Sequence, residues 1–300
     1  MKIKQHIIDI IKGFFIGTAL LIPGVSAASI ALISRVYQKL INNIANLTHN
    51  FLKSFLNLIP IGIGVALAMV SMWIPLKLAS EHILFAVVCL FAGSLIGSIP
   101  DVTDKLVNKE IHKKHYLIFI LGLIIGILLG ILSYFSDIDL SHLFNPIHYS
   151  LYLIIIPVGF IASLGVVVPG ISGSMILLVI GFYTQILGLI NQITSNPLGV
   201  IGVLACMAIG VILGMICFSK LMKYFLNKFE SETYIAILGL LIGSIFSIFF
   251  NRDVIYYFDH HGVPFYEGIL GGILLIIGFI VSYYLIVYQR KHKIKDDENR

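Results

Sequence analysis

Two short segments of the chain place serine hydroxyls directly after a Pro-Gly pair inside otherwise apolar sequence. Pro blocks helix continuation and Gly frees the backbone, so each pair predicts a helix break. When a helix restarts after a break, its first N–H groups lack partners; together with nearby hydroxyls they form an anion-binding site. The candidate residues are Pro23, Gly24, Ser26 and Ser29 at the first break, and Pro169, Gly170, Ser172, Gly173 and Ser174 at the second.

Three cations accompany the first break. Lys12 and Arg35 lie 11 and 12 residues from Pro23, which is about 16 to 18 Å along each arm if both arms are helical. Lys39 lies slightly beyond Arg35. These side chains would flank the mouth of a hairpin, where they could attract an anionic headgroup. The more common use of such residues is as anchors that snorkel to the membrane surface.

The composition indicates a membrane protein. Of the 300 residues, 58% are hydrophobic and 12% are charged, and the mean hydropathy is +1.00. Soluble domains carry about 25% charged residues, and several runs here approach the ~20 apolar residues that cross a bilayer. The sequence therefore predicts an all-α polytopic membrane protein.

The isoelectric point near 9.0 does not indicate nucleic-acid binding, because the basic residues lie between the apolar runs and at the ends of the chain. Cys89, Cys206 and Cys217 fall inside apolar runs without metal-ligand spacing. We expect them to pack, and we expect neither a metal nor another cofactor.

The chain contains an internal repeat. Shifting it by 146 residues places "PGVS" at 23–26 on "PGIS" at 169–172, and the sequence register continues to "GLIIGILL" at 122–129 on "GILGGILL" at 268–275. We predict a single membrane domain over 1–300, with repeats at 5–146 and 147–290 and a charged cytoplasmic tail at 291–300. Each repeat combines a broken segment, at 7–45 or 150–190, with three spans. The predicted spans are 56–78, 82–100 and 116–135, then 198–219, 233–250 and 266–288.

The broken segments fix the topology. A continuous helix of ~39 residues would be about 58 Å long, so each segment folds back at Pro-Gly as a re-entrant hairpin or as two crossings. Either choice leaves an odd number of crossings per repeat, which predicts an inverted repeat whose two breaks meet near the centre. Eighteen of the 20 Lys and Arg residues then lie on the side of both termini, and only Lys77 and Arg252 lie on the other. This bias places both termini in the cytoplasm.

Few other ionisable residues stand out. Asp101 and Glu267 lie near span ends, so a carboxylate relay for proton coupling is not evident, although these two remain candidates. His115 and His261 also match in the repeat, and we expect both to lie in solvated loops.

The segments "IPGVSAASIALISRVYQKLI" and "VPGISGSMILLVIGFYTQIL" resemble the PopT-type family of bacterial polyprenyl-phosphate translocases, over about residues 5 to 288. The resemblance implies a flippase in the bacterial cytoplasmic membrane. It would return undecaprenyl phosphate, the lipid carrier for cell-wall precursors, from the outer to the inner leaflet, with proton-linked transport suspected. The expected partners are this lipid and the membrane, and the oligomeric state stays open.

The first motif departs from the family pattern. Leu20 replaces an acidic or amide residue, Ala27 and Ala28 replace glycines, and Ser29 replaces Thr. Arg35 stands where Gly is usual, whereas the second motif, with Gly181, is intact.

Two alternatives remain. One is a transporter of another small or lipidic anion with the same architecture. The other is an enzyme similar to the membrane undecaprenyl-pyrophosphate phosphatases, whose related motif carries Arg where this chain has Gly173. Pyrophosphate cleavage needs charge neutralisation and a base or nucleophile, and neither is evident in the sequence.

Overall fold

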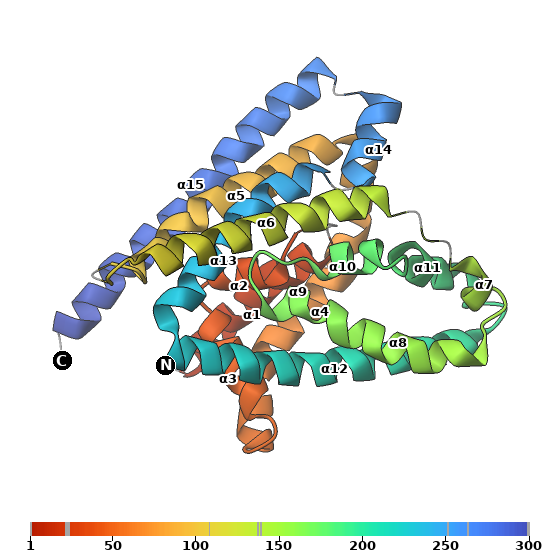
Figure 1. Cartoon of the computed structure of the whole chain (residues 1–300), viewed down its shortest axis with the longest axis horizontal. Helices are drawn as coiled ribbons and strands as arrows, with labels where there is room; N and C mark the ends of the chain where they lie inside the picture. The colour runs from red at the N-terminus through yellow and green to blue at the C-terminus, as the bar shows by residue number, and fades with distance from the viewer. Residues whose placement is uncertain are drawn as a thin grey trace.

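The computed structural model describes residues 2–21, 25–107, 109–136, 138, 140–250, 252–262 and 264–298. These residues are nearly all helical and contain no β-strand (Figure 1). The helices of the first half are α1 (Lys2–Leu20), α2 (Ala27–Ile33), α3 (Tyr37–Asn46), α4 (Phe51–His82), α5 (Leu84–Asp104), α6 (Lys113–Phe135) and α7 (Ser141–Phe144). Those of the second half are α8 (Tyr149–Ala162), α9 (Leu164–Val167), α10 (Gly173–Val179), α11 (Tyr183–Gly188), the 3₁₀ helix η1 (Leu189–Gln192), α12 (Pro197–Lys228), α13 (Glu230–Ser247), η2 (Ile248–Phe250), α14 (Arg252–His261) and α15 (Phe265–Glu298).

Seven helical stretches of the described chain are long and apolar enough to cross a membrane. Six of them contain or overlap the spans expected from the sequence, and the seventh, Tyr149–Val167, is the first arm of the second broken segment. The chain is therefore a multi-pass, helical membrane protein. Helix α15 runs through the tail expected at 291–300 as far as Glu298.

The repeat is visible in the helix boundaries. Helices α2 and α10 begin and end 146 residues apart, and so do α4 and α12. Helix α3 corresponds in the same way to α11 together with η1. The same sequence of helices therefore follows each Pro-Gly break, whereas the single helix α1 before the first break corresponds to α8 and α9 before the second.

Helix packing repeats as well. Helix α1 packs along α4, and α8 packs along α12. A Cβ on Gly13 would lie 2.1 Å from the carbonyl oxygen of Ile61, and one on Gly159 would lie 2.5 Å from that of Met207. Both pairs need glycine because the backbones touch, as small residues allow in membrane helices.

The last helix of each repeat departs from the sequence register. Helix α6 packs along α13, and α15 packs along α5. Gly122 contacts Ala236, and Gly278 contacts Leu90. The two partners, Leu90 and Ala236, are 146 residues apart in the chain, but the two glycines are 156 residues apart. The alignment of "GLIIGILL" with "GILGGILL" is therefore wrong by ten residues. The shift equals the ten residues of α14, which has no counterpart among the described residues of the first repeat.

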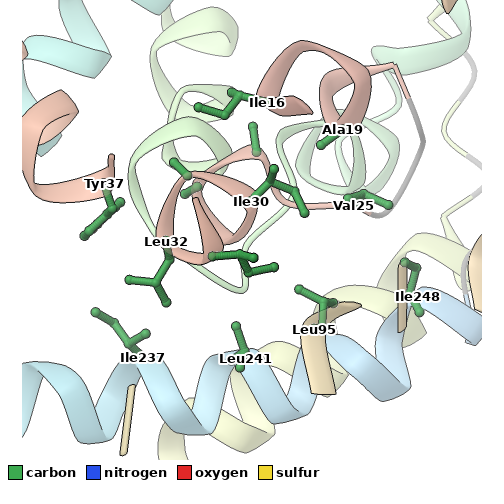
Figure 2. Close-up of a cluster of buried hydrophobic side chains, with 14 of the residues drawn as sticks. Ile16, Ala19, Val25, Ile30, Leu32, Tyr37, Leu95, Ile237, Leu241 and Ile248 are labelled. Atoms are coloured by element: carbon green, nitrogen blue, oxygen red, sulfur yellow. The ribbon is translucent and has the colours of Figure 1, made fainter. Parts of the chain in front are cut away.

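The main core surrounds α2. All seven residues of α2 are buried, and their neighbours come from α1, α3, α5 and α13. In Figure 2, Ile30 and Leu32 of α2 lie above Ile237 and Leu241 of α13, with Leu95 of α5 beside them. A second, separate cluster joins α7, α8, α10, α11 and α12. The first broken segment thus lies at the centre of the molecule.

Candidate functional site

The first break leads into a capped helix. Pro23 and Gly24 lie outside the described residues. Ser26 has extended backbone and is the N-cap of α2, and its hydroxyl accepts a hydrogen bond of 3.3 Å from the N–H of Ser29. Ser26 is buried, so its hydroxyl satisfies one of the open donors at the helix start.

The second break is described in full. Gly170 has φ = 87°, a left-handed conformation that suits glycine, and a Cβ there would lie 2.6 Å from the carbonyl carbon of Leu240. Helix α10 begins at Gly173, but the hydroxyl of its N-cap residue, Ser172, makes no capping bond. That hydroxyl instead lies 2.8 Å from the hydroxyl of Ser174.

The two breaks meet, as the sequence predicts. The N–H of Gly170 donates a hydrogen bond of 2.8 Å to the hydroxyl of Ser29. A second bond joins the same segments, because the Tyr37 hydroxyl donates to the carbonyl oxygen of Val167 at 2.8 Å. Both bonds are buried. Residues about 130 to 141 positions apart in the chain therefore form one polar centre inside the protein.

The three cations of the first segment gather near one another. Arg35 pairs with Asp101 of α5, with its Nε 3.0 Å from Oδ1. Lys39 pairs with Asp9 of α1 at 2.5 Å. Lys12 is half-buried and lies within electrostatic range of Asp9, Lys39 and Arg35, but it makes no hydrogen bond or ion pair in the described part of the chain. The cluster therefore holds two compensated cations and one that no carboxylate neutralises directly.

Arg35 also has an unusual backbone. Its φ is 52°, and it is the one described residue other than glycine with a positive φ. Its counterpart Gly181 has φ = 79°. A left-handed conformation costs a residue with a Cβ roughly 1–2 kcal/mol. The ion pair with Asp101 holds the Arg35 side chain at this strained junction between α2 and α3.

Two carboxylates, those of Asp9 and Glu267, are buried in a way that the sequence did not predict. Asp9 is fully buried between Gln5 and Lys39, although no acid was expected inside the membrane segments. Glu267, expected near a span end, is fully buried too; it accepts bonds of 2.9 Å from the Phe85 N–H and from the Tyr257 hydroxyl. The signal for Asp9 was its place three residues before Lys12, on the same face of a helix.

His115 does not lie in a solvated loop, and that expectation is wrong. It is only 4% exposed and lies in the first turn of α6. Its Nδ1 accepts the N–H of His112 at 2.9 Å, while its Nε2, 3.7 Å from Glu232, has no hydrogen-bond partner. The ring of His112 stacks on this ring, with the centroids 5.6 Å apart, which spacing alone does not reveal. The side chain of His261 lies outside the described residues.

The polar centre and the cation cluster offer hydrogen-bond donors. No group of three or more His, Cys, Asp and Glu side chains converges in the described residues. Hydroxyls, a glycine N–H and a cation cluster are donors for phosphate-like oxygens. The restarted helices α2 and α10 have seven residues each, so individual N–H and O–H groups supply the attraction, more than a long helix dipole does.

Comparison with known proteins gives one consistent result. A family model described as "Undecaprenyl phosphate translocase-like" matches residues 16–265. A polyprenyl-phosphate transporter of Staphylococcus aureus is 33% identical over 284 residues, covering 92% of this chain and 94% of the relative. One of Vibrio cholerae is 25% identical over 261 residues, covering 81% and 78%. No solved structure matches.

Proposed function

The chain belongs to the undecaprenyl phosphate translocase-like family, and on that premise we propose that it carries undecaprenyl phosphate across the bacterial cytoplasmic membrane. The family and its relatives are transporters, not enzymes. The proposed direction is from the outer to the inner leaflet, so that the lipid carrier is recycled for cell-wall polymer synthesis. The polyprenyl tail stays in the lipid while the phosphate crosses inside the protein.

The observation that carries the proposal is the bond between Gly170 and Ser29. In this state the Ser29 hydroxyl accepts the hydrogen bond from the Gly170 N–H. A phosphate oxygen could accept the same hydrogen bond in its place. A headgroup entering the polar centre would displace Ser29 and accept from Gly170, with the Ser172 and Ser174 hydroxyls close in sequence. Hydrogen bonds to a charged acceptor are stronger than neutral ones, so the exchange favours the phosphate.

The proposed topology is an inverted repeat with re-entrant broken segments and both termini in the cytoplasm. Its support is the recurrence of helix boundaries and glycine contacts at 146 residues, together with the distribution of Lys and Arg. Cysteine labelling at Asn145 and Asn227 tests it, and labelling of both from one side contradicts it.

The cation cluster is proposed to act where the headgroup leaves. Arg35 and Lys39 each have a carboxylate partner, which makes them chiefly structural in the present state. Lys12 lacks one among the described residues and is the cation we expect to attract the phosphate. Proton coupling is a proposal without an assigned residue.

One assay tests the function. The purified protein is placed in liposomes with labelled undecaprenyl phosphate or undecaprenyl pyrophosphate, and leaflet exposure and phosphate release are measured together. We expect exchange of the monophosphate between leaflets without phosphate release. Ser172→Ala should slow exchange about tenfold, as expected for a lost bond to a charged group, while a change at the exposed Ser71, Ser71→Ala, should not. Phosphate release would identify an enzyme, and neither activity would point to another anion.

A further inference from the structure

One pair of contacts breaks the repetition described above. Helix α3 packs along α12 of the other repeat. The counterpart of this contact would join α11 and η1 to α4, and the described residues show no comparable packing there. The two long helices are otherwise equivalent, because both run for 32 residues and their boundaries are 146 residues apart. The difference therefore lies in the arrangement of the repeats and not in the lengths of their helices.

Burial follows the same asymmetry. Ile41 on α3 is 2% exposed, and Met222 and Phe218 of α12 belong to the core cluster that contains it. The counterpart of Ile41 is Leu187 on α11, which is 47% exposed. The first broken segment is thus closed against the other repeat, while the equivalent face of the second is not.

A hydrogen bond marks the closed contact. Lys223 of α12 donates from Nζ to Oδ1 of Asn46, the last residue of α3, at 3.0 Å. The positions 146 residues away hold Lys77 on α4 and Gln192 at the end of η1. The same chemistry, a lysine and a side-chain amide, is therefore present at the open contact. Lys77 is also one of the two basic residues that the sequence places on the outer side.

We propose that Lys77 and Gln192 form the latch of a second state, in which α11 and η1 pack along α4 and the Lys223–Asn46 contact opens. The proposal rests on the function proposed above, since a carrier must expose its site to each side in turn. The present structure is then the state closed on the side of the termini. In the second state Leu187 becomes buried as Ile41 is buried here.

The geometry indicates why the two latches alternate. In the empty carrier the broken segments are tied together by the bonds from Gly170 to Ser29 and from Tyr37 to Val167, and the second bond remains when a headgroup displaces Ser29. Each broken segment also packs on the long helix of its own repeat, α1 on α4 and α8 on α12, so the two repeats rock about these central bonds, and the contact that forms on one side is lost on the other. Alternating access in inverted repeats works by such rocking of one part against the other around a fixed site. Packed interfaces support two discrete arrangements better than a continuous range.

Crosslinking in liposomes tests the proposal. In a full-length protein without Cys89, Cys206 and Cys217, one variant carries Asn46→Cys with Lys223→Cys. A second carries Lys77→Cys with Gln192→Cys. A short bifunctional thiol reagent should link both pairs, and undecaprenyl phosphate should change the two yields in opposite directions. In a protein with all four cysteines, a molecule should form one link and not both.

The control pair is Asn46→Cys with Lys77→Cys. Asn46 ends α3 shortly before α4 begins at Phe51, and Lys77 lies about 39 Å further along α4, so this pair should never link. The proposal is overturned if the pair at 77 and 192 never links, or if both links form in one molecule. Leaflet exchange is measured in the same liposomes before crosslinking. If undecaprenyl phosphate exchanges between leaflets but residues 77 and 192 never crosslink, only the latch is contradicted. If each two-cysteine variant crosslinks but undecaprenyl phosphate does not exchange, only the proposed function is contradicted.

Single substitutions give an independent readout. Lys223→Ala should lower the thermal stability of the resting protein, because it removes a bond of the present state. Lys77→Ala should slow leaflet exchange about tenfold, the factor expected for losing a charged hydrogen bond. Lys77→Arg should restore most of the rate. Leaflet exchange at the unaltered rate in Lys77→Ala would contradict the assignment of Lys77 to the second state.

Discussion

The two broken segments share the helix boundaries that follow their breaks but differ in their surroundings. All seven residues of α2 are buried, whereas Gly173, Ser174 and Val179 at the ends of α10 are only half-buried. Ser26 spends its hydroxyl on capping α2, and the corresponding Ser172 makes no capping bond. Duplication has therefore preserved the path of the chain and changed how its polar groups are used.

The closeness of the backbones differs as well. In the second segment Gly165 touches the start of α10, and a Cβ there would lie 1.9 Å from the nitrogen of Gly173. The first segment has Ala19 and Ala27 at the corresponding positions, and both are buried. The helices of the first hairpin are thus far enough apart for alanine methyl groups, whereas those of the second are close enough to require glycine. This suggests a division of roles, in which the first hairpin supports the site and the second presents donors to the ligand.

The strongest test exchanges these small residues. Gly165→Ala should lower the free energy of unfolding by about 3 kcal/mol, because the new methyl group overlaps backbone that cannot rotate away. Ala19→Gly, the reciprocal change, should cost about 1 kcal/mol through helix propensity. Thermal unfolding of the purified variants measures both. Similar losses in the two variants would show that the hairpins are equally wide.

The bond between the breaks is tested next. Ser29→Ala leaves the buried N–H of Gly170 without an acceptor and should cost about 1–3 kcal/mol of stability. The freed N–H should also bind the phosphate headgroup more tightly, in contrast to the loss expected for Ser172→Ala. Binding to the purified variant and its unfolding midpoint are measured together. Ser71→Ala, which changes an exposed serine, is the control, and weaker headgroup binding in Ser29→Ala would place Ser29 among the ligand's own contacts.

The junction after each short helix gives a smaller effect. Arg35→Ala and Arg35→Gly both lose the Asp101 pair, but only glycine accepts a φ of 52° without strain. We expect Arg35→Gly to be more stable than Arg35→Ala by about 1 kcal/mol. Unfolding of the two variants measures this difference directly. An equal or lower stability of the glycine variant would show that the conformation relaxes when the ion pair is lost.

Much of this comparison could be predicted from the sequence. Pro-Gly pairs and the 146-residue spacing located both breaks, because helix interruption is a local property of the backbone. The meeting of the breaks followed from parity and symmetry, and the contact between Gly170 and Ser29 confirms it. These features depend on chain geometry and not on individual side-chain partners.

Side-chain partners were harder to predict. Asp9 is covered by Lys39 of another helix, and His115 lies between its neighbour His112 and Glu232 of α13. Hydropathy near a span end does not show such contacts. The ten-residue shift was missed because apolar helices rich in Gly, Leu and Ile align in several registers. Only the packing of Gly278 against Leu90 distinguishes the correct one.

Lys12 offers the smallest effect and the clearest reading of the cation cluster. Arg35 and Lys39 pair with carboxylates, so Arg35→Gln should lower stability more than it lowers transport at saturating lipid. Lys12→Gln should leave stability nearly unchanged and slow leaflet exchange about threefold at low salt, within the range of a partly exposed charge interaction. The difference should shrink as salt screens the attraction. If Lys12→Gln exchanges the lipid at the unaltered rate at low salt, Lys12 is an anchor alone. The first hairpin would then contribute its shape, through Ser29 and the buried α2, but no charge for the headgroup.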